Sequence, residues 1–384
     1  MESAPVSAVW LTEQSSAASA GSARRRVEIS RWKECMMTAT KPALGKPPQR
    51  GPFAWVGAFT GFYPAQADDF AHLDPVTRFL YASRSVILVI SAQSAVIGGL
   101  LAATHRRFEL LPFVLVFVGY VVLHAISNLS NDYFGYRRGH DTEDSPRRRY
   151  TLHPIASGAV TPRLLAGGLV LLGLIALGIA VYFVALRGWG ALILAAIGAV
   201  LLYAYDAAPR ALKELGLGEV AAFAVWGPLM IGGGYYVITS QLSGEAFLVS
   251  VPIGLGVASI LIGKHIDQRV FDTSQQQRTL PVLLGERGAR LLNQSAVAAM
   301  YAVTLVAIAI GSLTVFALVV LVAAPRALRA LRVMSRPAPA EPPTGYVGWP
   351  LWYHRVCLVH HRAFGWLFII GLAVGAVFPD VRIG

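Results

Sequence analysis

The chain has 384 residues, of which 55% are hydrophobic and 14% charged, with a formal net charge of +12 at pH 7. Soluble domains carry about 25% charged residues, so the composition excludes an ordinary soluble protein and indicates a membrane protein. The basic residues fall between apolar runs and do not gather on one face. This pattern argues against a nucleic-acid partner and favours contact with the surface of a lipid bilayer.

Residues 1–75 are rich in Ser, Ala, Pro and Arg. Such a composition is typical of a segment that is disordered or lies on the membrane surface. Residues 76–384 hold the apolar runs, and we expect them to form a single transmembrane domain.

Nine apolar runs follow one another, each near the ~20 residues that a membrane-spanning helix needs. They lie at about 84–104, 108–128, 163–186, 189–205, 218–239, 246–264, 291–311, 313–331 and 363–379. The sequence therefore predicts an all-α integral membrane protein with about nine transmembrane helices in a helical barrel or bundle.

Two acidic clusters stand at the ends of long apolar runs, where charged side chains persist only with a partner or a function. The first cluster contains Asn128, Asn131, Asp132 and Asp141. The second contains Lys264, Asp267, Arg269 and Asp272. Each cluster follows the second helix of a predicted four-helix unit, so we expect two pseudo-repeated halves. Internal repeats in membrane proteins commonly place the site at their interface, and the two loops are expected to form one charged mouth.

The loop charges predict the orientation of the spans. With the N-terminus inside, the outer loops hold only three basic residues, which are Arg106, Arg107 and Arg187. The positive-inside rule then supports nine spans, with both acidic clusters on the cytoplasmic side.

The acidic clusters have the chemistry of a magnesium diphosphate site. Mg²⁺ prefers one or two carboxylates together with phosphate oxygens and water. The candidate carboxylate ligands are Asp132, Asp141, Asp267 and Asp272, with Asn128 and Asn131 as additional ligands. Asn128 and Asp132 project from one helical face because they are four residues apart. Asp267 and Asp272 are five apart, so a π-bulge or an unwound turn is needed to bring them together.

Nearby cations can stabilise the negative charge of a leaving diphosphate. The candidates are Lys264, Arg269, Arg278 and one of the pair Arg137 and Arg138. The apolar helices would hold a long hydrocarbon and keep water from an allylic cation. A prenyl diphosphate is the substrate that these features share.

The chain resembles the UbiA-type superfamily of membrane-embedded prenyltransferases over roughly residues 76–380. The matching stretches are Asn128–Phe134, His153–Gly158, Gly216–Glu219, Lys264–Asp272 and Arg278–Gly285. The resemblance implies nine helices in a barrel, two Mg²⁺ ions that bridge a prenyl diphosphate, and transfer to an aromatic or quinone-precursor acceptor. It also implies a bacterial inner membrane, with the active site on the cytoplasmic side. Asp132, Asp141, Asp267 and Asp272 would be the catalytic metal ligands, and Lys264 and Arg278 would contact the diphosphate.

Two alternatives to prenyl transfer stay open. The family usually has an Asp where this chain has Gly135, and its second motif usually spaces the carboxylates four residues apart. The relaxed first motif resembles that of terpene cyclases in the superfamily, which need no acceptor. A polar acceptor site near His153 or Glu219 would favour transfer, whereas a sealed pocket lined by Trp226 and Tyr235 would favour cyclisation. The second alternative is a transporter or a non-catalytic membrane scaffold.

Overall fold

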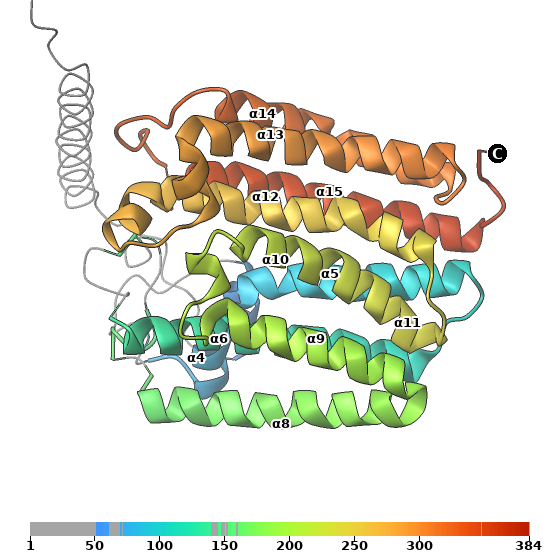
Figure 1. Cartoon of the computed structure of the whole chain (residues 1–384), viewed down its shortest axis with the longest axis horizontal. Helices are drawn as coiled ribbons and strands as arrows, with labels where there is room; N and C mark the ends of the chain where they lie inside the picture. Colours follow the sequence, from blue (N-terminus) through green and yellow to red (C-terminus); the bar gives the residue numbers. More distant parts are fainter. Residues whose placement is uncertain are drawn as a thin grey trace, which may run out of the picture.

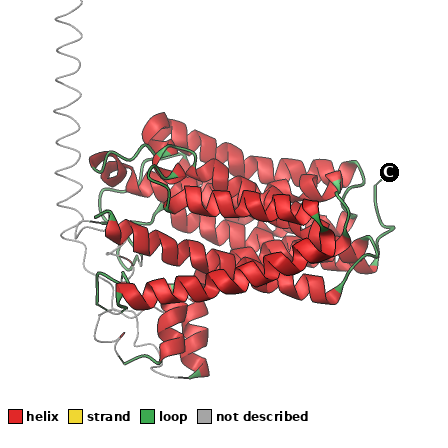
Figure 2. Cartoon of the chain, turned by 60° about the horizontal axis from the view of Figure 1, so that its bottom comes forward, coloured by secondary structure: helices red, strands yellow, loops and turns green. Residues whose placement is uncertain are grey.

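The structure is a computed structural model that describes residues 51–60, 70, 72–139, 145–146, 150, 153–158, 160–346 and 348–383. Every regular element in these residues is a helix, and no strand occurs among them (Figure 2). This confirms the predicted all-α fold. The predicted site residue Asp141 and most of residues 1–75 lie outside the described residues.

Eight helices of the described residues are long and apolar enough to cross a membrane. They are α5 (Ser85–Thr104), α6 (Leu110–Arg137), α8 (Pro162–Arg187), α9 (Trp189–Asp206), the segment Gly218–Thr239, α12 (Gly244–Ser274), α13 (Leu280–Ala309) and α15 (Tyr353–Val377). The helices run side by side, from α8 at one edge to α13 and α14 (Ala324–Met334) at the other (Figure 1). Because α12 packs against α13, α15 and the Gly218–Thr239 segment, it is the most buried span.

The predicted span at 313–331 is built from two shorter helices. A 3₁₀-helix, η3 (Val315–Ala323), continues directly into α14. A 3₁₀-helix rises about 2.0 Å per residue, compared with 1.5 Å in an α-helix, so nine residues of η3 extend about 18 Å. Neither helix alone has the length of a membrane-spanning α-helix, so the predicted span at 313–331 is covered by two helices of different type.

The fifth predicted span also changes its helix type. It comprises α10 (Gly218–Ala224), the π-helix η2 (Val225–Gly232) and α11 (Gly233–Thr239). Pro228 lies inside η2, and its missing N–H removes a regular helical hydrogen bond. The Ser94 hydroxyl donates to the carbonyl oxygen of Trp226, and the Tyr120 hydroxyl donates to that of Met230. Helices α5 and α6 thus satisfy backbone groups of the irregular segment.

Hydroxyl side chains cap the N-termini of two of the long helices, as is common for Ser and Thr. The Thr161 hydroxyl accepts a hydrogen bond from the N–H of Leu164 at the start of α8, and Ser243 caps α12 in the same way. Within the predicted N-terminal extension, α2 (Pro52–Thr60) packs on α4 (Pro75–Ala82) and on α5. Ser85 donates to the carbonyl oxygen of Ala58 at 3.0 Å. This part of residues 1–75 is therefore folded onto the bundle.

Candidate functional site

The first motif lies on the last turns of α6, against the start of α5. Asn128 and Asp132 share one face of the helix, as expected, and both are buried. Asn128 Nδ2 donates to the carbonyl oxygen of Ser83 at 2.9 Å, and Asp132 forms an ion pair with Arg84. Arg84 has a positive φ of 56° at the start of α5, which turns its backbone into the helix. Arg84 was not among the predicted site residues, although it is a charged residue at the start of the first apolar run.

Asn131 lies apart from this pair. Its Oδ1 accepts a hydrogen bond from Lys213 Nζ at 3.1 Å, and the same ammonium pairs with Asp206 Oδ1 at 2.6 Å. The predicted ligand Asn131 therefore joins the end of α6 to the connection between α9 and α10. Asp206 is fully buried, and its Oδ2 has no hydrogen-bond partner among the described residues.

Of the two arginines at the end of the first motif, Arg138 contacts other residues of the site. Arg137 is exposed. Arg138 donates to the carbonyl oxygens of Asp206 and Ala207 at 2.9 and 3.0 Å, and lies 3.6 Å from a carboxylate oxygen of Glu214. These contacts satisfy the carbonyl groups that the end of α9 leaves without helical partners.

The second motif is split by the regular geometry of α12. The helix continues without a bulge to Ser274, so Asp267 and Asp272 point about 140° apart around its axis. Asp267 accepts hydrogen bonds from the N–H groups of Tyr353 at 3.0 Å and His354 at 2.9 Å. The π-bulge or unwound turn that would bring the two carboxylates together is absent from α12, and the only π-helix in the described residues is η2. Asp267 anchors the start of α15 and does not face Asp272.

Asp272 is buried in a charged environment. Thr279 Oγ1 donates to its Oδ2 at 3.2 Å, and its charged neighbours are His265, Lys264 and Glu219. The ring nitrogen Nδ1 of His265 lies 2.7 Å from Glu219 Oε1, and both side chains are buried. The second oxygen, Glu219 Oε2, has no hydrogen-bond partner among the described residues.

The other two predicted cations of this half lie at the rim. Arg269 lies 4.0 Å from Glu286, and the Arg278 side chain is exposed. The N–H of Arg278 donates to the carbonyl oxygen of Glu214 at 3.0 Å. This contact sets the connection between α12 and α13 against the connection between α9 and α10.

The ends of α6 and α12 therefore lie at the same end of the bundle, where Glu214 links them. Glu214 contacts both Arg138, beyond α6, and Arg278, beyond α12. Tyr205 has Arg84, Asp206 and Glu219 as charged neighbours, which links the two halves again. We call this region the charged mouth, made of Arg84, Asp132, Asp206, Lys213, Glu219, Lys264, His265 and Asp272. No three His, Cys, Asp or Glu side chains of the described residues are grouped closely enough to hold a metal ion alone.

Of the two aromatic residues that the sequence analysis names, Trp226 is on the side of the charged mouth. Its Nε1 donates to Ser91 Oγ at 2.9 Å, and Ser91 bonds His124, which precedes Asn128 by one turn on α6. The Tyr235 hydroxyl lies 2.7 Å from His105 Nδ1 at the opposite end. Trp226 and Tyr235 therefore have their polar partners toward different ends of the bundle.

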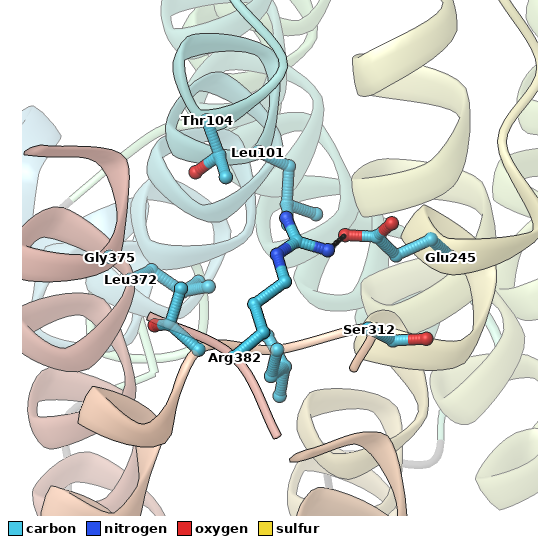
Figure 3. A pocket seen from close by; sticks show the side chains of 9 residues that line it. Leu101, Thr104, Glu245, Ser312, Leu372, Gly375 and Arg382 are labelled. Carbon is cyan, nitrogen blue, oxygen red and sulfur yellow. Dashed lines mark ion pairs between the residues drawn. The ribbon is translucent and has the colours of Figure 1, made fainter. Parts of the chain in front are cut away.

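The end opposite the charged mouth is closed by an ion-pair network. A small pocket there is lined by residues from α5, α12, α15 and the C-terminal tail (Figure 3). Arg382 lies 3.8 Å from Glu245, which also lies 3.2 Å from His105 Nε2 (Figure 3 shows the first pair). Arg382 also donates to the carbonyl oxygen of Gly311 at 2.7 Å. Glu245 thus has both Arg382 and His105 as partners, so these side chains connect the C-terminal tail, α12 and the end of α5.

Comparison with known proteins gives consistent results. Residues 92–356 match the model of the UbiA prenyltransferase family. The 1,4-dihydroxy-2-naphthoate octaprenyltransferase of Bacillus subtilis is 23% identical over 250 residues, which cover 65% of this chain and 79% of that protein. The 2-carboxy-1,4-naphthoquinone phytyltransferase of Synechocystis is 27% identical, over 58% of this chain and 69% of that protein.

Among solved structures, the apo form of a UbiA homologue from Aeropyrum pernix is 18% identical. The structural match covers 76% of this chain and 97% of the homologue's chain, with a TM-score of 0.49. The family model spans more than half of the chain, including both motifs of the charged mouth. The chain belongs to the UbiA prenyltransferase family, whose members are membrane-embedded transferases of prenyl groups.

Proposed function

We propose that this protein transfers a prenyl group from an allylic prenyl diphosphate to an aromatic or quinone-precursor acceptor, with Mg²⁺ as cofactor. The two curated relatives described above carry names of naphthoate or naphthoquinone prenyl transfer. The observation that carries the proposal is the buried pair of Glu219 and His265 beside Asp272. An acceptor must lose a proton when it gains a prenyl group, and this pair is a proton acceptor next to the carboxylate of the second motif.

The carboxylates of the charged mouth fit Mg²⁺ bound together with a diphosphate. Mg²⁺ is usually held by one or two carboxylates plus substrate phosphates, so a site made of three protein carboxylates is not required. Asp132 and Asp272 each supply one buried carboxylate. The free oxygens Asp206 Oδ2 and Glu219 Oε2 add unused acceptors in the same region. Asp141, which lies outside the described residues, remains a candidate ligand. When bound, Mg²⁺ supplies positive charge to the leaving diphosphate.

The cations of the mouth act on the same leaving group. Lys264 lies beside Asp272 and stabilises the charge that grows on the diphosphate as its carbon–oxygen bond breaks. Arg84 holds the buried Asp132 carboxylate in place through their ion pair. The electron pair of the broken bond leaves with the diphosphate, and the acceptor carbon forms the new bond to the prenyl carbon.

Glu219 and His265 receive the acceptor's proton in this proposal. His265 fixes Glu219 through Oε1, which leaves Oε2 directed to no other described group. A hydroxyl of the acceptor donates to this oxygen, becomes more nucleophilic, and its proton passes to the pair. Because the pair is at the polar mouth and not in the apolar part of the bundle, it suits a polar acceptor better than a hydrocarbon cation.

The orientation also belongs to this proposal. The helix ends at the charged mouth carry most of the basic loop residues of the chain. The positive-inside rule places that end in the cytoplasm, and we propose a bacterial inner membrane as the location.

Acceptor dependence of the purified protein tests the proposal. The assay supplies Mg²⁺, geranylgeranyl or a longer prenyl diphosphate, and 1,4-dihydroxy-2-naphthoate, and measures released diphosphate and prenylated product together. We expect product only when the acceptor is present, and a large loss of product in Glu219→Gln. Cyclic hydrocarbon formed without any acceptor would contradict transfer and would support a terpene cyclase, in agreement with Gly135 in the first motif.

A further inference from the structure

Helix α14 carries a row of arginines that the charged mouth does not use. Arg326, Arg329 and Arg332 recur at every third residue, and Arg336 follows the end of the helix. The first three lie within about 120° around the helix axis, and all four side chains are exposed. The opposite side of α14 is formed by Ala327, Ala330 and Met334, which are buried against the bundle. We call the four residues the arginine stripe.

The arginine stripe has no side-chain partner among the described residues, unlike three arginines that form ion pairs at the same end of the bundle. Arg138, Arg269 and Arg290 each lie within 4.0 Å of a glutamate. No side chain of the stripe has a hydrogen bond or an ion pair with another described residue. The chain from Val315 to Ala340 contains no Asp or Glu. No described residue therefore neutralises these four exposed positive charges.

Contacts between α14 and α13 show where the arginine stripe lies along the axis of the bundle. Gln294 Nε2 donates to the carbonyl oxygen of Leu331, and Arg290 Nη1 donates to that of Met334. The end of α14 is thus level with the last polar residues before the apolar part of α13. Arg326 precedes Leu331 by five residues, so it lies about 8 Å further along the axis, beside that apolar part. The helix is at the edge of the bundle (Figure 1), so this face meets lipid.

The surface of this segment changes from apolar to basic along its length. Leu318, Leu321 and Val322 of η3 are exposed, and Leu328 remains half-exposed between the arginines. An arginine that faces lipid extends its apolar stem along the hydrocarbon and places its guanidinium among the headgroups. A guanidinium binds a phosphate through two parallel hydrogen bonds. The required ligand therefore carries a phosphate and lies at the boundary between hydrocarbon and water.

We propose that the arginine stripe of α14 is a binding surface for the headgroups of anionic phospholipids. The phosphates neutralise the four guanidinium groups, and acyl chains pack on the exposed leucines and valine of η3. Basic residues near the surface of a membrane attract anionic lipid in this way. The proposal concerns a face of the molecule away from the charged mouth and does not depend on the reaction catalysed there.

Thermal unfolding of the full chain in a neutral detergent tests this proposal. Phosphatidylglycerol is titrated into the micelles, with phosphatidylcholine as the neutral lipid for comparison. Three proteins are compared: the wild type, the triple variant Arg326→Gln/Arg329→Gln/Arg332→Gln, and the control Arg106→Gln/Arg107→Gln. The control removes exposed arginines from the opposite end of the bundle.

We expect phosphatidylglycerol, and not phosphatidylcholine, to raise the melting temperature of the wild type and the control. The half-saturating concentration should rise about fivefold for each arginine removed from the stripe. The single variant Arg329→Gln should show this fivefold change if the triple variant does not fold. An unchanged phosphatidylglycerol response in either stripe variant would overturn the proposal. Equal stabilisation by inorganic phosphate would also overturn it, because a lipid would then not be required.

Discussion

Asp267 and Asp272 are two carboxylates of one helix with different surroundings. Asp272 is buried beside Lys264 and His265, whereas Asp267 accepts two backbone hydrogen bonds at the start of α15. The N-terminus of a helix carries partial positive charge and free N–H groups, so a carboxylate is a suitable cap there. We therefore assign Asp272 to the reaction and Asp267 to the position of α15.

This assignment predicts different effects of two matched substitutions. Asp272→Asn should raise the Mg²⁺ concentration required for half-maximal activity by at least about tenfold, because a metal-binding oxygen is lost. Asp267→Ala should leave that concentration unchanged. It should lower the free energy of unfolding by about 1–3 kcal/mol, because buried backbone donors lose their partner. Magnesium titrations and thermal unfolding of both variants measure these effects, and a Mg²⁺ shift in Asp267→Ala would refute the assignment.

Residue types and spacing were sufficient to predict some of the site but not its pairings. Asn128 and Asp132 share a face because four residues make about one helical turn. The partner of Asp132 is Arg84, 48 residues earlier, and the partner of Asp267 is the N–H of Tyr353, 86 residues later. Such contacts depend on which helices pack together, and a single sequence does not contain that information.

At the scale of elements, α12 and α15 approach closely because of Gly263. A Cβ atom added at this position would lie 2.9 Å from the backbone nitrogen of His354 and 3.0 Å from the carbonyl carbon of Tyr353. Gly263 is one turn before Asp267 on the same face of α12, so the small residue and the cap together seat the start of α15.

Gly263→Ala should therefore destabilise the protein by about 1–3 kcal/mol, as overpacking does in well-packed interiors. Gly167→Ala on α8 is the matched control, because no atom lies within 4 Å of the added Cβ. We expect the control to be neutral or to stabilise slightly, since alanine favours the helix more than glycine. Thermal unfolding of the two variants decides, and equal melting temperatures would show that α15 is not seated by close contact.

The N-terminus of α4 provides a second test at this scale. Asp74 accepts hydrogen bonds from the Thr77 hydroxyl at 2.5 Å and the Thr77 N–H at 2.9 Å. The hydroxyl, followed by the N–H, lowers the pKa of Asp74 from 3.8 to about 2. A lowered carboxyl pKa stabilises the folded state above about pH 4, and this contribution is lost as the pH falls through about 2.

Asp74→Ala should accordingly lower the melting temperature at pH 7 by about 2 °C, the effect of losing one helix cap. The difference from the wild type should shrink as the pH falls from 4 to 2. Melting curves at pH 7, 4 and 2 measure this difference in melting temperature. A difference that grows at low pH would contradict the stabilising role of the ionised Asp74.

Helix content was predictable from the sequence for most of the bundle. Long apolar runs need only local hydropathy to be recognised, and eight predicted spans are present as long apolar helices. The exceptions are η3 and η2, where the chain leaves the α-helical path. Pro228 gives a local reason for η2, whereas no residue of η3 marks a 3₁₀-helix, and its packing against α15 is not visible in the sequence.

At the scale of the whole molecule, the bundle has two chemically different ends. One end holds the charged mouth, where buried carboxylate oxygens of Asp206 and Glu219 lack partners among the described residues. At the other end, Glu109 pairs with Arg187 at 2.7 Å, and Glu245 lies between His105 and Arg382. Unpaired buried carboxylate oxygens therefore occur at the charged mouth, whereas these carboxylates of the other end are paired.

We propose that the ends of α6 and α12 together form one catalytic mouth. The most direct test measures prenylated product for Asp132→Asn, Asp272→Asn and the control Glu109→Gln, with Mg²⁺, a prenyl diphosphate and a naphthoate acceptor. We expect a loss of at least about a hundredfold in each motif variant, because charge stabilisation of the leaving group is removed, and full activity in the control. Product formation at the wild-type rate in either motif variant would contradict it.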